Sequence, residues 1–178
     1  MKRLPVAVFV LTALQVPPTL SAAGAMLKIT IKGGGLAQPI EIAGQEQRAK
    51  FSIGGGPGTG CGLPDRPVSP VCQAILQRSY SRSFIVDWSK GVIDAPREGL
   101  VNYEVEFLMS RPGPMNTYRV SYAYDPVKQE GFVYIPGKDD PRHNENVWLI
   151  IRGVEGNWYH AWSDWDAVAT ALLQATRH

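Results

Sequence analysis

Hydrophobic and polar residues alternate most regularly over residues 100–135. Successive side chains of an extended strand point to opposite sides, so the tyrosines and the valine of residues 118–124 share one face. Asp125-Pro126 and Gly131 supply turn residues before the next apolar run, 132–136. Residues 100–109 alternate in the same way, so a three-stranded antiparallel meander is predicted over 100–135. The residues expected to share the apolar faces are Val101, Tyr103, Val105, Phe107, Tyr118, Val120, Tyr122 and Tyr124.

Shorter runs predict further strands. Residues 26–32 alternate, with Leu27, Ile29 and Ile31 on one face, and residues 39–42 could fold back on them. The apolar run 146–151 fits a buried strand and also a helical turn. The remaining short strands are predicted at 49–53, 83–88 and 157–162.

Residues 164–175 carry the strong helical signal that follows the strands. Ser163 stands ahead of two acidic residues, which is typical of an N-cap and a helix first turn. Apolar residues at i, i+3, i+4 and i+7 form one stripe, made of Trp165, Val168, Ala169 and Leu172. The fold class predicted is α+β, predominantly antiparallel β: a sheet or two-layer β structure with a C-terminal helix packed on it.

The first 25 residues have the layout of a secretory signal peptide. Two basic residues precede an apolar run at 4–16 and a small-residue site with Ala23 and Ala25. The apolar run is shorter than the roughly 20 residues that a membrane-spanning helix needs. We therefore expect cleavage after Ala25, or alternatively after Ala23, and a secreted or periplasmic protein without a stable membrane span. An uncleaved anchor is the competing interpretation.

Residues 26–178 are predicted to form a single β-rich domain with balanced charge. The full chain has 18 basic and 16 acidic residues, and the leader removes the basic Lys2 and Arg3. Nucleic-acid binders usually carry a clustered excess of Lys and Arg. Since no window of this sequence has one, nucleic acid is not an expected partner.

Residues 54–72 form a glycine- and proline-rich segment that contains both cysteines. Because an exported protein meets an oxidising compartment, Cys61 and Cys72 are predicted to pair and to pin this loop. A free thiol or a pair of metal ligands is the alternative, although zinc sites usually need four closely spaced ligands. The glycines at 55–60 have the spacing of a phosphate-binding loop. However, Cys61 and Gly62 stand where that motif needs Lys and Ser or Thr, so the motif lacks its chemistry.

The histidines and acids form no motif of a known activity. His143, His160 and His178 have no metal-binding spacing, and no metal or cofactor is expected. The sequence also lacks a G-x-S-x-G element. One alternative function is a small secreted hydrolase that uses His160 or a carboxylate pair such as Asp164 with Glu155. Another is a component of an envelope assembly that pairs through a sheet edge.

Clustered aromatic residues near the C-terminus suggest a binding surface. Trp148 and Trp165 are expected in the core, where Trp165 lies on the helical stripe. Trp158, His160 and Trp162 fall on one side of the predicted last strand and are the candidate ligand-binding residues. The leading hypothesis is an exported, non-enzymatic module that binds a small ligand, a glycan or a protein through an aromatic-lined surface.

Overall fold

The computed structural model describes residues 26–42, 44–54, 56, 84–110 and 116–176, and every structural statement below concerns these residues. The predicted signal peptide, the predicted Cys61–Cys72 disulfide and most of the 54–72 loop lie outside the described residues. Within the described ranges, no helix is long and apolar enough to span a bilayer.

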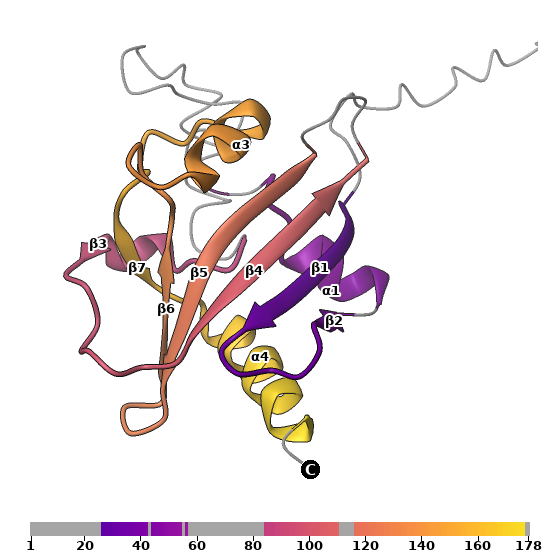
Figure 1. Ribbon diagram of the computed structural model, residues 1–178, viewed down its shortest axis with the longest axis vertical. Coiled ribbons are helices and arrows are strands. Elements are labelled where there is room, and N and C mark those ends of the chain that lie inside the picture. Colours follow the sequence, from indigo (N-terminus) through magenta and orange to yellow (C-terminus); the bar gives the residue numbers. More distant parts are fainter. Residues whose placement is uncertain (1–25, 43, 55, 57–83, 111–115, 177–178) are drawn as a thin grey trace, which may run out of the picture.

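The structure contains a seven-stranded sheet in which all neighbouring strands are antiparallel (Figure 1). The strand order is β2-β1-β4-β5-β6-β7-β3. The central β4, β5 and β6 are the predicted meander, which is confirmed. In chain order, the strands are β1 Met26–Gly33, β2 Ile40–Ile42, β3 Val92–Ile93, β4 Asn102–Met109, β5 Thr117–Asp125, β6 Glu130–Tyr134 and β7 Trp158–His160.

Helices lie at both ends of the sheet. In Figure 1, α3 lies at its upper end and α4 at its lower end. The C-terminal α4 packs on the sheet as predicted, which confirms the α+β fold class. The helices are α1 Gln45–Lys50, the 3-10 helix η1 Trp88–Lys90, α3 Arg142–Leu149 and α4 Ser163–Ala175.

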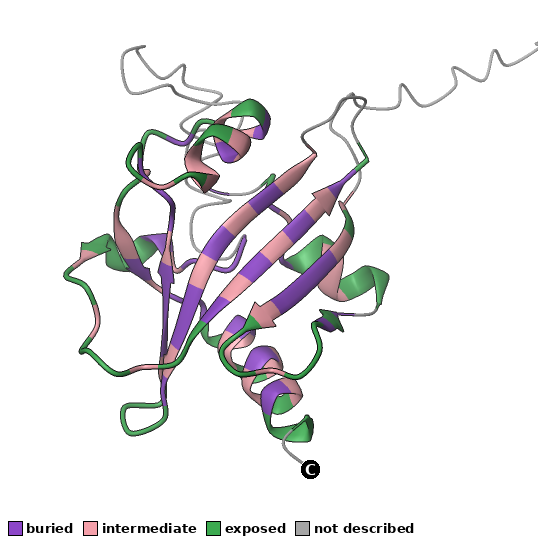
Figure 2. Cartoon of the chain, viewed as in Figure 1, coloured by how far each residue is buried: buried purple, intermediate pink, exposed green. Residues whose placement is uncertain are grey.

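The core lies on one side of the sheet, here called the inner face, which carries Tyr118, Val120 and Tyr122. All three are fully buried, and buried and half-buried residues alternate along β4 after its exposed first residue and along β5 as far as Tyr122 (Figure 2). Trp165 of α4 is also fully buried and meets the rings of Tyr122 at 5.8 Å and Phe51 at 5.3 Å, edge to face. The helix therefore closes the core through its predicted apolar stripe.

The ends of two strands depart from the predicted alternation. Leu27 is 48% exposed, because the pairing of β1 with β4 is irregular between Met26 and Lys28 and leaves the intervening residue without a partner. Val101 is 44% exposed and precedes the first residue of β4. The alternation of sequence positions therefore predicts which face of the sheet a side chain lies on only where the strand pairs regularly with its neighbour.

A buried arginine, Arg152, joins its own irregular segment to the irregular segments around Ile53 and Phe84, and it also contacts strand β5. Arg152 is 2% exposed, and its guanidinium lies 4.7 Å from the ring centroid of Phe84 and 5.5 Å from that of Tyr118. It donates hydrogen bonds to the Tyr118 hydroxyl at 3.2 Å and to the Ile53 carbonyl at 2.5 Å. Buried charges of this kind persist only when they are paired or hydrogen-bonded. No periodicity or motif in the sequence marks this residue.

Two strand predictions fail beside this arginine. Residues 49–53 are not a strand, since α1 ends at Lys50 and the chain then turns with Phe51 and Ile53 buried. In the predicted 83–88 strand, Val86 forms only an isolated bridge. The Asp87 side chain accepts a hydrogen bond from the Ser89 backbone and so starts η1.

Of the two alternatives for residues 146–151, the helical one is found over most of the run, because α3 extends to Leu149, and the strand is not formed there. Asn146 is buried and bonds both backbone groups of Arg119: the Arg119 N–H donates to its Oδ1 at 2.7 Å, and its Nδ2 donates to the Arg119 carbonyl at 2.6 Å. Asn146 and Leu149 face the protein, so Trp148 faces away and is 67% exposed. The expectation of a buried Trp148 is therefore incorrect.

The start and the apolar stripe of α4 differ from the prediction in detail. Ser163 is the first residue of the helix, and Trp162 occupies the N-cap position without a side-chain cap. Trp165 and Ala169 are buried as predicted, and Leu173 completes the buried set, whereas Leu172 is only partly buried.

Two tryptophans offer a direct test of where the core lies. We expect Trp165→Ala to lower the free energy of unfolding by about 3–5 kcal/mol, because it empties a fully buried site. The exposed Trp148→Ala should change it by less than about 0.5 kcal/mol. Urea unfolding followed by circular dichroism measures both values. Equal losses of unfolding free energy in the two variants would contradict the placement of α4.

Candidate functional site

Two of the three predicted ligand-binding residues share a surface, and the third does not. Trp158 and His160 lie on the outer face of β7, opposite the buried Tyr159. Trp158 packs against Tyr134 with ring centroids 5.3 Å apart, and His160 packs against Phe132 at 5.5 Å. We call these four residues the outer aromatic strip.

Trp162 belongs to the core instead. It is 9% exposed and meets the ring of Phe51 at 5.7 Å, with the Lys50 ammonium 5.0 Å from its own ring centroid. The strand β7 ends at His160, so the alternation that would keep Trp162 beside Trp158 no longer applies. The structure therefore separates Trp162 from the other two residues.

A small hollow of about 160 Å³ brings His160 close to the start of α4. His160 lines it together with Asp166 and Ser163, and with Asp87 and Lys90 from the η1 segment. We call it the His160 hollow. With Glu130, which also lines it, the hollow brings together an imidazole, a hydroxyl, an ammonium and three carboxyl groups.

The predicted carboxylate pair, Asp164 with Glu155, is not part of the His160 hollow. Asp164 pairs with the Lys50 ammonium at 2.6 Å. Glu155 accepts a hydrogen bond from the backbone N–H of Arg152 at 2.6 Å. Each acid thus has a structural partner elsewhere.

Asp166 fastens α4 to the hairpin of β5 and β6. Its Oδ1 accepts a hydrogen bond from the Tyr122 hydroxyl at 2.8 Å, and its Oδ2 accepts one from the Gly131 N–H at 2.9 Å. A Cβ atom on Gly131 would lie 1.9 Å from Oδ1, so this position requires glycine. The sequence identified Asp166 only as an acid in the first turn of the helix.

Burial perturbs the acidity of both side chains in this contact. Loss of solvent raises the pKa of Asp166 to about 6, although the hydrogen bonds from Tyr122 and Gly131 and the charge of Lys90 act in the opposite direction. Burial, together with the neighbouring Asp166, also raises the pKa of Tyr122. Perturbed carboxyl groups that line a concave site are candidates for acid-base chemistry.

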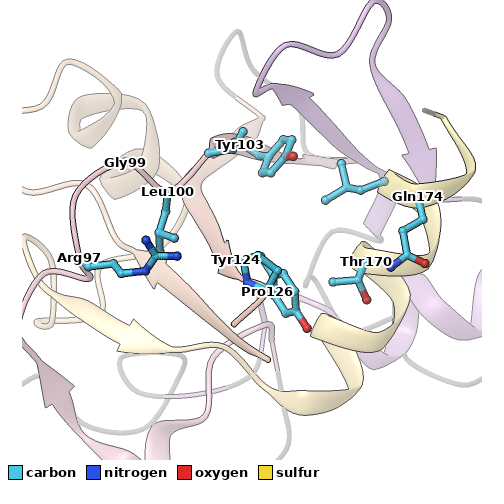
Figure 3. A pocket seen from close by; sticks show the side chains of 10 residues that line it. Arg97, Gly99, Leu100, Tyr103, Tyr124, Pro126, Thr170 and Gln174 are labelled. Carbon is cyan, nitrogen blue, oxygen red and sulfur yellow. The ribbon is translucent and has the colours of Figure 1, made fainter. Parts of the chain in front are cut away.

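A larger pocket, of about 250 Å³, lies between α4 and the adjoining ends of β4 and β5 (Figure 3). Tyr103 and Tyr124 contribute aromatic rings to its wall, and Leu100, Val101 and Leu173 contribute aliphatic side chains. We call it the tyrosine pocket. Its tyrosines come from the inner faces of the two central strands, so the alternation of the meander places them here.

Polar groups stand around the rim of the tyrosine pocket. In Figure 3, Arg97 lies on one side of the hollow, and Thr170 and Gln174 of α4 lie on the other. Arg97 is bound to Asp125 through its Nε at 2.7 Å and its Nη2 at 3.2 Å. This pair ties the loop before β4 to the end of β5.

The pair of Arg97 and Asp125 also neutralises the rim. Asp125 is buried, and the Arg97 guanidinium holds its pKa well below the usual range, with help from the backbone N–H groups of Val127 and Lys128. Among the described residues that line the pocket, Arg97 is the charged one. The pocket therefore offers hydrogen-bonding groups without an uncompensated charge.

A third hollow, of about 580 Å³, adjoins the turn at 34–39. Glycine and aliphatic residues make up most of its lining. It offers few side chains that could orient a ligand, so it is the weakest of the three candidates.

Comparison of the chain with protein-family models, with curated proteins and with solved structures found no match. Across the described residues, no group of three or more His, Cys, Asp and Glu side chains is arranged to hold a metal ion.

The raised pKa of Asp166 predicts a pH dependence of stability. Its pKa rises from the usual 3.8 to about 6 in the folded protein, so the folded state holds the proton more tightly than the unfolded state does. The contribution of Asp166 to the free energy of unfolding is complete below pH 3.8 and is lost as the pH rises through about 6. The loss is on the order of 3 kcal/mol.

Asp166→Asn should remove this pH-dependent contribution to stability. Asp164→Asn is the matched control, since the Asp164 side chain pairs with Lys50 at the surface. Urea unfolding at intervals from about pH 3 to 8 gives the free energy of unfolding at each pH. The wild-type protein and Asp164→Asn should lose stability relative to Asp166→Asn over this range. Parallel curves for all three proteins would show that Asp166 does not carry the effect.

Proposed function

We propose that the protein is an exported, non-enzymatic binding module that holds a small uncharged ligand in the tyrosine pocket. Export is proposed from the leader-like pattern of residues 1–25. The observation that carries the binding role is the pocket itself: two tyrosine rings and aliphatic side chains surround one hollow, with a few polar groups at its rim. Ligand sites in proteins are concave and mostly apolar, with a small number of placed polar groups.

The outer aromatic strip is a weaker location for a small ligand. Trp158, Tyr134 and His160 are half-buried, and their rings already pack against one another or against Phe132. A strip on one face of a sheet contacts a ligand from a single side, whereas the tyrosine pocket contacts it from the sheet, the loop and α4. Trp158 and His160 remain proposed as a contact surface for a glycan or a protein partner.

A specific observation favours the hydrolase as a second candidate. The His160 hollow contains His160 and Asp166, whose pKa of about 6 suits proton transfer near neutral pH. An envelope role through edge pairing receives less support. The edge strands β2 and β3 are three and two residues long and offer few backbone groups to a partner strand.

Filling the tyrosine pocket tests the binding role. Val101→Trp places a large ring at the pocket, and Val92→Trp is the matched control, because Val92 is an exposed valine of β3 outside the pocket lining. Saturation-transfer NMR with uncharged one-ring compounds (methyl glucoside, phenol, nicotinamide and uracil) measures binding. We expect Val101→Trp to weaken binding at least tenfold and Val92→Trp to leave it unchanged. Equal binding by both variants, or no binding by the wild-type protein, would exclude the proposal.

Chromogenic nitrophenyl esters, phosphates and glycosides test the second candidate. General acid-base groups contribute about 10²- to 10⁴-fold to a rate, so His160→Gln and Asp166→Asn should each lower turnover by at least about 100-fold. Asp164→Asn should retain the wild-type rate. Circular dichroism checks that each variant is folded. Turnover no faster than that of buffer alone would remove the hydrolase.

A further inference from the structure

We infer that the ligand of the tyrosine pocket is a pyranose sugar ring, either free or at the end of an uncharged glycan. This inference rests on the proposed function, because it names the chemical class that the same pocket would hold. It depends on the size of the pocket, the chemistry of its walls and the charge at its rim.

The size of the pocket limits the ligand to about one ring. Its volume is about 250 Å³. Pockets for drug-sized molecules span roughly 300 to 1,000 Å³, so this one falls just below their range. A single six-membered ring with its substituents is the appropriate size, and a longer chain would have to extend past the rim.

The walls suit a ligand that has an apolar face and a polar edge. Tyr103 is 5% exposed and packs near the Tyr122 ring, with centroids 6.4 Å apart, so it forms a fixed part of the wall and leaves only a small ring area to a ligand. Tyr124 lies across the hollow, half-buried (Figure 3). A tyrosine offers an apolar ring together with a hydroxyl that can hydrogen-bond. The C–H face of a pyranose can pack on such a ring while its hydroxyls point outward.

The rim suits hydroxyl groups in particular. Arg97 uses its Nε and Nη2 for Asp125 and has further N–H donors on the same planar group. Gln174 lies on the opposite side of the hollow, and its amide both donates and accepts (Figure 3). A sugar hydroxyl also donates and accepts, so it can pair with either side chain.

The charge at the rim disfavours acidic ligands. Asp125 is buried beside Arg97 and already compensates its charge. A carboxylate or phosphate entering the pocket would lose water without gaining an unpaired cation. An uncharged polyol ring avoids this cost, which distinguishes neutral sugars from uronic acids and sugar phosphates.

Binding measurements with matched sugars test the inference. The probes are methyl glucoside, methyl galactoside, methyl mannoside and N-acetylglucosamine. Mannitol has the hydroxyls without a ring face, glucuronate adds a charge, and phenol is a flat ring with a single hydroxyl. Affinities come from NMR titration of protein carrying ¹³C-labelled tyrosine, which reports on Tyr103 and Tyr124 directly.

At least one neutral pyranose should shift the tyrosine signals and bind at least tenfold more tightly than mannitol, glucuronate or phenol. Val101→Trp should abolish the shifts, Gln174→Leu should weaken binding severalfold, and Val92→Trp should bind like the wild-type protein. An oligosaccharide ending in the same ring should bind equally well if the ligand is a glycan terminus. If the ligand is a free sugar, the oligosaccharide should bind more weakly.

The outcomes separate this inference from the proposed function. If phenol, nicotinamide or uracil binds in a Val101→Trp-sensitive way and no sugar does, the sugar inference is wrong and the binding pocket stands. If no compound binds the wild-type protein, both proposals are wrong. Sugar binding that is unchanged in Val101→Trp would place the sugar elsewhere and overturn the inference.

Discussion

The structure depends on the docking of α4 against the inner face of the central strands. Trp165 is the largest fully buried side chain of the described residues, and complete burial of a tryptophan is worth on the order of 4–6 kcal/mol of transfer free energy. Asp166, on the next position of the helix, opposes this gain because its carboxyl group is desolvated. It also fixes the helix in register through Tyr122 and Gly131. Apolar burial therefore holds the helix on the sheet, and a costly polar contact selects its position.

Polar side chains also hold segments in place where the alternation of apolar residues does not. Arg152 joins the segment around Ile53 to the one around Phe84 through ring contacts and hydrogen bonds. Asn146 bonds both backbone groups of Arg119 and so holds α3 beside β5. A buried polar group that loses its partner is expensive, so each of these contacts specifies one arrangement of its segment.

The tyrosine pocket follows from these constraints. Its walls are the ends of β4 and β5, the second half of α4 and the loop that Arg97 fastens to Asp125. The helix position set by Trp165 and Asp166 therefore determines how far Thr170 and Gln174 stand from Tyr103 and Tyr124. The second half of α4 thus lines a candidate binding site, and its first turn carries the carboxyl group whose pKa is raised by burial.

The sequence by itself determined the elements whose hydrophobic period is long and regular. Alternation over β4 and β5 and the i, i+3, i+4 spacing around Trp165 predicted the meander, the helix and the α+β class. The short runs at 49–53 and 83–88 did not form the predicted strands, and 146–149 became helical, which was one of two alternatives. The hydrogen bonds of Asp87 and Asn146 at the last two segments are contacts that local propensity does not contain.

The candidate sites were decided by the tertiary structure. Trp158 and His160 were identified correctly as neighbours on one face. Trp162 lies in the core because β7 ends at His160, and the helical period of α3 leaves Trp148 in solvent. Arg97, Tyr103, Tyr124 and Gln174 come from distant positions in the chain and carry no shared motif. Only the packing of α4 across the strand ends brings them together, since a pocket is a property of surfaces in contact and not of spacing along one segment.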